Sequence, residues 1–186
     1  MGQRVLFHAC CAPCASAGLP ALLNDGYLVS LFFYGGNIHP EVDWNKRLEA
    51  LERLSFAYSV QLRARPYDTN EWADAVKGLE HEPEGGKRCA VCMKLQIEKA
   101  AQFAVAEAIP TLCTSLTLSP QKSPRLINQL GNEIAQKYGL EWLERIWRKN
   151  NGVLKSVQES RRLSLYRQKY CGCRFSIRDS SSLAEA

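Results

Sequence analysis

The 186-residue sequence has no apolar run that approaches the roughly 18 residues of a membrane helix. Its first residues lack the apolar stretch and cleavage site of a signal peptide. It also has no internal repeat, no low-complexity tract and no long linker. We therefore expect a cytoplasmic protein with no membrane partner and a single domain over residues 1–186. Within it we expect an α/β core over 1–140, a basic part with a cysteine pair over 141–178, and a frayed tail over 179–186.

Cysteine, in contrast, is abundant, with eight residues. Because the reducing cytosol keeps thiols free, clustered cysteines there more often bind metal or carry redox chemistry than form structural disulfides. Cys113 stands alone in a strand-like run, where we expect a small buried side chain. The other seven form three tight groups: Cys10, Cys11 and Cys14; Cys89 and Cys92; Cys171 and Cys173.

Short strand-like runs alternate with amphipathic segments along the chain. This alternation indicates an α/β fold with a mostly parallel sheet and flanking helices, Rossmann-like or HUP-like, followed by a basic helical C-terminal segment. The expected strands lie near residues 4–8, 28–34, 60–64, 111–115 and 140–147. The expected helices lie near residues 15–24, 44–58, 68–76, 89–108, 124–138 and 154–163.

The first cysteine group lies in the motif His8-Ala-Cys-Cys-Ala-Pro-Cys14, directly after the first expected strand. In open α/β sheets, ligands bind at the loop that leaves the carboxyl end of a strand, and a nucleotide-binding protein has a glycine-rich loop there. This chain has thiols and a proline instead. Three thiols within five residues indicate a reactive or metal-binding loop rather than an inert buried pair.

The second group lies in Gly85-Gly-Lys-Arg-Cys-Ala-Val-Cys92. If a helix begins near Arg88, Cys89 and Cys92 lie one turn apart on one face, close to the helix N-terminus and two cations. With the adjacent cysteines of the first motif they complete a set of four thiolates. The spacing differs from that of a zinc ribbon, so an iron–sulfur cluster fits better, and zinc stays the main alternative.

The third group lies in Tyr166-Arg-Gln-Lys-Tyr-Cys-Gly-Cys173. A disulfide across a single residue closes a very small ring, so it should be strained and easily reduced, as in a redox-active pair. Neighbouring cations favour the thiolates. The alternative is a further pair of metal ligands.

Positive charge is concentrated near the C-terminus. Residues 145–178 carry a net charge of +9, which leaves −4 for the rest of the chain. Trp147, Tyr166, Tyr170 and Phe175 lie among these basic residues. Cations beside aromatic rings suit a phosphate backbone with exposed bases, whereas a solvated basic helix is the alternative.

Together these motifs resemble the cobalamin-independent epoxyqueuosine reductases, the QueH family. The resemblance rests on HACCAPC at 8–14, FFYGGNIHP at 32–40, EPEGGKRCAVC at 82–92, TSLTLSPQK at 114–122 and LYRQKYCGC at 165–173. Members of this family reduce the epoxide of epoxyqueuosine in the wobble position of tRNA to queuosine. The resemblance implies a 4Fe-4S cluster on Cys10, Cys11, Cys89 and Cys92, and a redox-active disulfide between Cys171 and Cys173.

The resemblance also bears on Cys14. Because the family has a thiol or a carboxylate at this place, an additional iron ion in contact with Cys14 is implied, and the fourth cluster ligand stays open. Gly35-Gly36 stands where the family pattern has Asn-Pro, which affects a turn rather than the chemistry.

The expected partners are tRNA carrying epoxyqueuosine and an external electron donor, and the electrons come from the dithiol or through the cluster. Our phosphate-contact candidates are Lys87, Arg88, Lys122, Arg148, Lys149, Arg167 and Lys169. Two other functions are alternatives. A tRNA-thiolating enzyme of the ATP-pyrophosphatase type would need a pyrophosphate loop in place of HACCAPC. A zinc-bound RNA-binding module would have no use for a strained Cys-Gly-Cys pair.

Overall fold

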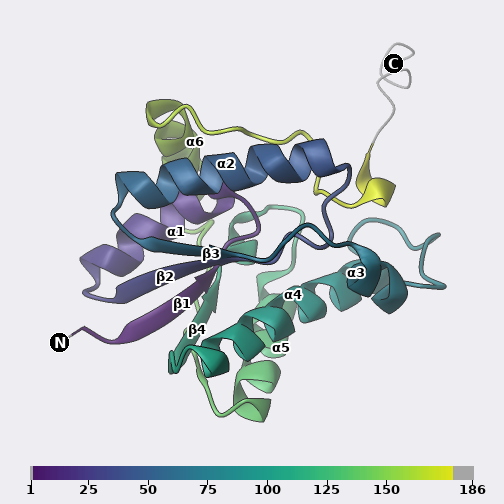
Figure 1. Ribbon diagram of the computed structural model, residues 1–186, viewed down its shortest axis with the longest axis horizontal. Coiled ribbons are helices and arrows are strands. Elements are labelled where there is room, and N and C mark those ends of the chain that lie inside the picture. The colour runs from purple at the N-terminus through teal and green to yellow at the C-terminus, as the bar shows by residue number, and fades with distance from the viewer. Residues whose placement is uncertain (1, 178–186) are drawn as a thin grey trace.

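A computed structural model of the chain describes residues 2–177 (Figure 1). The predicted tail over 179–186 lies outside the described residues. Five strands form one sheet in the order β3-β2-β1-β4-β5, and all four neighbouring pairs are parallel, which confirms the predicted α/β class. The strands are β1 (Arg4–His8), β2 (Leu28–Phe33), β3 (Gln61–Ala64), β4 (Thr111–Thr114) and β5 (Glu141–Trp142).

Helices cover both faces of the sheet (Figure 1). One face carries α1 (Ala12–Asn24), α2 (Glu41–Ala57) and α6 (Gly152–Arg162), and the other carries α3 (Asn70–Ala75), α4 (Lys87–Ala106) and α5 (Pro124–Lys137). Two short 3-10 helices, η1 (Leu116–Leu118) and η2 (Arg174–Ser176), follow β4 and the last cysteine pair. Among residues 2–177, none of the helices has both the length and the apolar character needed to span a bilayer.

Strand β1 lies at the centre of the core. Val5, Leu6 and Phe7 are fully buried, as expected for a parallel strand covered on both faces. Because side chains alternate across a strand, Val5 and Phe7 pack with Leu19 of α1, whereas Leu6 packs with Ile97 of α4. A rigid strand therefore carries the first cysteine motif at its carboxyl end.

The strand predicted near 140–147 is much shorter in the structure, where β5 covers only two residues. After Leu143 the chain turns inward and buries Trp147, whose ring meets the ring of Phe7 edge-on at 5.6 Å. The Trp147 Nε1–H donates to the carbonyl of Thr114 at 2.8 Å. Gly18 makes room for the indole, since a Cβ there would lie 3.0 Å from it. Burial of this large aromatic side chain therefore takes the place of further edge-strand pairing.

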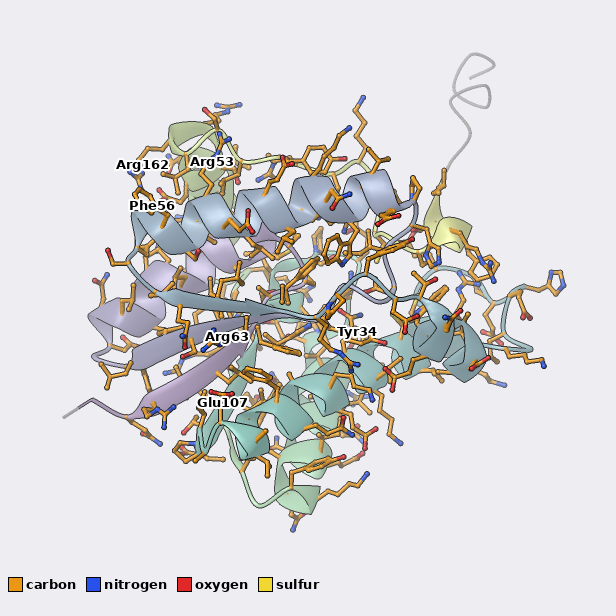
Figure 2. All side chains as sticks on the ribbon, viewed as in Figure 1. Tyr34, Arg53, Phe56, Arg63, Glu107 and Arg162 are labelled. Atoms are coloured by element: carbon orange, nitrogen blue, oxygen red, sulfur yellow. The ribbon has the colours of Figure 1, made fainter. Side chains whose placement is uncertain are left out.

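We predict that Trp147→Phe destabilises the fold by about 1–2 kcal/mol, because the buried Thr114 carbonyl loses a donor and the indole leaves unfilled space. Urea unfolding measures this change. The matched control is Phe56→Ser at the C-terminal end of α2 (Figure 2), where the ring is 87% exposed. That control should change stability by less than about 0.5 kcal/mol. An unchanged midpoint for Trp147→Phe would contradict the packing role.

Candidate functional site

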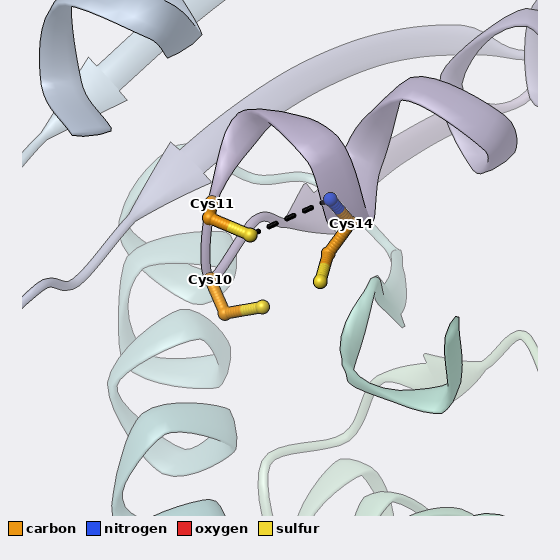
Figure 3. A group of neighbouring side chains, drawn as sticks. All are labelled: Cys10, Cys11 and Cys14. Carbon is orange, nitrogen blue, oxygen red and sulfur yellow. Dashed lines mark hydrogen bonds between the residues drawn. The ribbon is translucent and has the colours of Figure 1, made fainter. Parts of the chain in front are cut away.

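The first cysteine motif forms the junction between β1 and α1. Cys11 caps the helix, and its Sγ accepts a hydrogen bond from the Cys14 backbone N–H at 3.4 Å (Figure 3). Pro13 lies in the first helical turn, where a missing N–H leaves no helix bond unmade. The cap therefore turns the chain so that Cys14 comes back over the two adjacent cysteines.

Cys10, Cys11 and Cys14, here called the cysteine triad, bring their Sγ atoms within 4.8 Å of one another. No other group of three or more His, Cys, Asp or Glu side chains gathers its ligand atoms this closely among residues 2–177. Cys11 is fully buried, whereas Cys10 and Cys14 are partly exposed. Closely spaced sulfur donors fit a thiophilic metal such as zinc or iron in a cluster. The structure thus joins Cys14 to Cys10 and Cys11.

Hydrogen bonds within the triad shift the pKa values of the three thiols in different directions. Bonds from the Cys10 and Cys14 side chains lower the pKa of Cys11 well below its usual value. The reciprocal bonds to Cys10 and Cys11, together with burial, raise the pKa of Cys14, and the bond to Cys11 raises the pKa of Cys10. Cys11 is therefore the thiol of the triad that loses its proton most readily.

Two polar residues that the sequence reasoning did not single out support the triad. Ser115, just after β4, accepts a hydrogen bond from the Cys10 backbone N–H at 3.1 Å, and its hydroxyl donates to Cys10 Sγ at 3.5 Å. The Gln168 amide donates to Cys11 Sγ at 3.0 Å. Both lie inside quoted motifs, TSLTLSPQK and LYRQKYCGC, and that was the signal available for them.

Cys89 and Cys92 lie in the first two turns of α4, as predicted from the CxxC spacing. The Gly85 N–H donates to Cys89 Sγ at 3.2 Å, and the Gln96 amide donates to Cys92 Sγ at 3.2 Å. Burial raises the pKa of Cys92 to about 12. Neither sulfur belongs to the close group of the triad. The four-thiolate set that joins them to Cys10 and Cys11 stays a prediction.

The Cys-Gly-Cys segment, residues 171–173, lies next to this pair. Cys173 is 7% exposed and belongs to a small apolar cluster with Trp72, Val76 and partly buried Cys92. Cys171 and Cys89 line a common small cavity of about 50 Å³. Both cysteines of the segment carry free thiols in the structure, so the predicted disulfide is not formed in it.

Lys122 lies between the two sulfur groups. Its Nζ donates to Cys171 Sγ at 3.4 Å. Burial lowers the pKa of Lys122, but the negative charges that Cys171, Cys10 and Cys14 can carry outweigh this effect and raise it. Lys122, which was predicted to contact a phosphate, thus contacts a cysteine sulfur in the structure.

A cleft of about 370 Å³ opens beside Cys14, Lys122 and Cys171. Arg167, Gln168 and Lys169 also line it, so one wall comes from the basic C-terminal part. Cations and thiols therefore share a cavity of the size that small-molecule sites usually have.

The remaining phosphate-contact candidates differ in exposure. Lys87, Lys149, Arg167 and Lys169 are exposed. Arg148 is partly buried, and its Nη1 donates to the carbonyls of Ser119, Pro120 and Lys122. These bonds hold the loop after η1 and use the N–H donors of Arg148 Nη1.

Arg88 requires a correction. Its side chain is 3% exposed, it donates to the carbonyls of Leu79, Glu80 and Glu82, and its guanidinium lies 4.8 Å from the ring of Phe175. Because an arginine in this place is unavailable to a phosphate, its role is to join α4 to η2.

A sequence model of the family described as epoxyqueuosine reductase QueH matches residues 5–179. The chain belongs to this family. The reductase QueH of Acinetobacter baylyi is 36% identical over 180 residues, which cover 96% of this chain and 83% of that protein. The reductase QueH of Thermotoga maritima is 36% identical over 179 residues, which cover 93% of this chain and 90% of that protein. The predicted resemblance is confirmed, and the chain is an oxidoreductase of the QueH family.

A solved structure has the same fold. It is the U34-tRNA thiolase NcsA from Methanococcus maripaludis with its 4Fe-4S cluster, at a TM-score of 0.57 and 14% identity. The match covers 98% of this chain and 64% of the thiolase chain. At this identity the likeness shows the fold alone. The family of the chain rests on the sequence match over residues 5–179.

We predict that Cys14→Ser weakens the binding of Co²⁺ to cluster-free protein by about tenfold or more, because the triad loses one of its three sulfur ligands. The sulfur-to-cobalt absorption band measures binding. The affinity should rise with pH in both proteins, since the thiols release protons on ligation. Cys113→Ala is the control, because Cys113 is buried in β4 outside the triad. Equal Co²⁺ affinity in all three proteins would refute a ligand role for Cys14.

Proposed function

We propose that the chain reduces the epoxide of epoxyqueuosine in the wobble position of tRNA to the alkene of queuosine. The observation that carries this proposal is the family match over residues 5–179, in a chain where Cys14 of the triad and Cys171 line one cleft. We further propose that it acts in the cytoplasm, as the last step of queuosine biosynthesis.

The proposed reaction requires a two-electron reductant. Removal of the epoxide oxygen breaks two C–O bonds, leaves a C=C bond, consumes two electrons and two protons, and releases one water. Oxidation of the Cys171 and Cys173 thiols to a disulfide supplies these electrons and protons, and an external reductant resets the pair.

The cysteines also suit an iron–sulfur centre. Cys10, Cys11, Cys89 and Cys92 would hold a 4Fe-4S cluster, and Cys14 would contact an additional iron ion. The donor chemistry supports this assignment, since the triad already gathers three thiols within 4.8 Å. When bound, such a centre supplies a Lewis acid for the epoxide oxygen and a route for single electrons.

The chain itself contributes charge and shape. Lys122 holds a proton at Nζ and donates a hydrogen bond to Cys171 Sγ at 3.4 Å. The cleft of about 370 Å³ is large enough for a nucleoside taken out of the base stack. The exposed cations Lys87, Lys149, Arg167 and Lys169 are the proposed phosphate contacts.

The proposal is tested first by anaerobic purification, iron and sulfide analysis, and an absorption spectrum. About four irons and four sulfides per chain are expected for a 4Fe-4S protein. Reduction of epoxyqueuosine-containing tRNA by this material is the second measurement. Zinc without sulfide, reproducibly and without exposure to oxygen, would contradict the reductase function.

We predict that Cys171→Ser abolishes multiple turnover and leaves the cluster spectrum intact, because the redox pair is lost while the proposed cluster ligands remain. Turnover is followed by nucleoside analysis of the tRNA. Cys113→Ala is the matched control, because it removes a buried thiol that does not line the cleft. Undiminished turnover in Cys171→Ser would show that the electrons do not come from this pair.

A further inference from the structure

Arg47, in the middle of α2, is 2% exposed although it carries a charge. Its Nε donates to Asp43 Oδ2 at 2.7 Å. Its Nη1 donates to the carbonyl of Cys171 at 2.9 Å, and its Nη2 reaches the carbonyl of Tyr170 at 3.4 Å. One guanidinium therefore ties α2 to the backbone directly before Gly172, across 124 positions of sequence.

The opposite side of the guanidinium is fixed as well. Asp43 is 5% exposed, and its other carboxylate oxygen accepts a hydrogen bond from the Tyr166 hydroxyl at 2.5 Å. The ring of Tyr170 lies 5.4 Å from the guanidinium carbon. The carboxylate thus binds Arg47 on one oxygen and the C-terminal part on the other, so the pair cannot rotate freely.

The Cys-Gly-Cys segment is shaped around this guanidinium. Gly172 has a φ of +136°, a conformation that side-chain-bearing residues rarely adopt. A Cβ at Gly172 would lie 3.1 Å from Arg47 Nη1, so close approach also requires glycine. The His39 backbone N–H donates to the Gly172 carbonyl at 2.9 Å and holds the segment from a second direction.

We propose that Arg47 is a positioning residue whose planar fork fixes the Cys-Gly-Cys segment, so that Cys171 faces Lys122 and the triad. The redox role of Cys171 rests on the proposed function. The position of the segment against Arg47 does not depend on that function. Only arginine supplies donors in a rigid fork that can bind a carboxylate and two carbonyls at once, and lysine keeps the charge without the fork.

Substitutions that keep either the positive charge or some of the hydrogen-bond donors of Arg47 test this proposal. Arg47→Lys keeps the charge, and Arg47→Gln keeps some donors without charge. Arg53→Lys on the same helix is the matched control, because Arg53 is exposed and donates to the Ser164 carbonyl at 3.3 Å (Figure 2). The measurements on anaerobically purified holoenzyme are kcat and KM for tRNA, and iodoacetamide labelling of Cys171 and of the buried Cys113 in β4, quantified by peptide mass spectrometry.

We expect both Arg47 variants to lower kcat by about tenfold or more with little change in KM, since a loosened segment misplaces the reacting sulfur without altering the RNA contacts. Labelling of Cys171 should become severalfold faster relative to Cys113. The Arg53 control should match the wild type. Wild-type kcat and labelling in Arg47→Lys would overturn the proposal, and equally raised labelling of both cysteines would reduce Arg47 to a general structural residue and overturn it too.

Tyr166→Phe covers the case in which the Arg47 variants fold poorly. It removes only the hydroxyl that holds Asp43 and should shift kcat and Cys171 labelling in the same direction, by less. A Tyr166→Phe protein identical to the wild type in both measurements would then overturn the proposal. If wild-type protein reduces no epoxyqueuosine while Arg47→Lys still exposes Cys171 selectively, the proposed function fails and the positioning role stands.

Discussion

Strand β1 pairs in parallel with β2 on one side and with β4 on the other, and the whole site depends on this arrangement. Parallel pairing brings the carboxyl ends of the three strands to one edge of the sheet. The connections after β1 and β4 leave in opposite directions, which opens a crevice between them. The triad loop occupies this crevice, and the bonds between Cys10 and Ser115 join its two sides. Strand direction thus brings together residues more than one hundred positions apart.

The C-terminal part is held to this edge by buried arginines of other elements. Arg47 of α2 binds the carbonyl of Cys171, and Arg88 of α4 lies against Phe175 of η2. Burial of a guanidinium is costly unless its donors find acceptors, and backbone carbonyls accept hydrogen bonds from both arginines, although Arg88 Nε is left without a partner among residues 2–177. The excess positive charge of residues 145–178 is therefore free to face solvent, where Lys149, Arg167 and Lys169 are exposed.

Thiols in close groups also need cations nearby, because each additional thiolate repels those already formed. Arg47 acts on the triad from the side of α2, and Lys122 acts on the triad and on Cys171 from the loop before α5. One lysine therefore lies close to both the triad and the Cys-Gly-Cys segment. The sequence suggested that Lys122 contacts a phosphate, whereas in the structure its ammonium contacts Cys171 Sγ.

The sequence alone determined the fold class, the three cysteine groups and the family, because these depend on local periodicity and on contiguous motifs. It placed Cys89 and Cys92 on a helix turn for the same reason. Only the tertiary structure decided that Cys14 joins Cys10 and Cys11, that Arg88 faces inward, and that the last strand ends after two residues. These outcomes depend on space, burial and partners distant in sequence. A sequence states which residues carry charge or sulfur, and packing decides which of them meet.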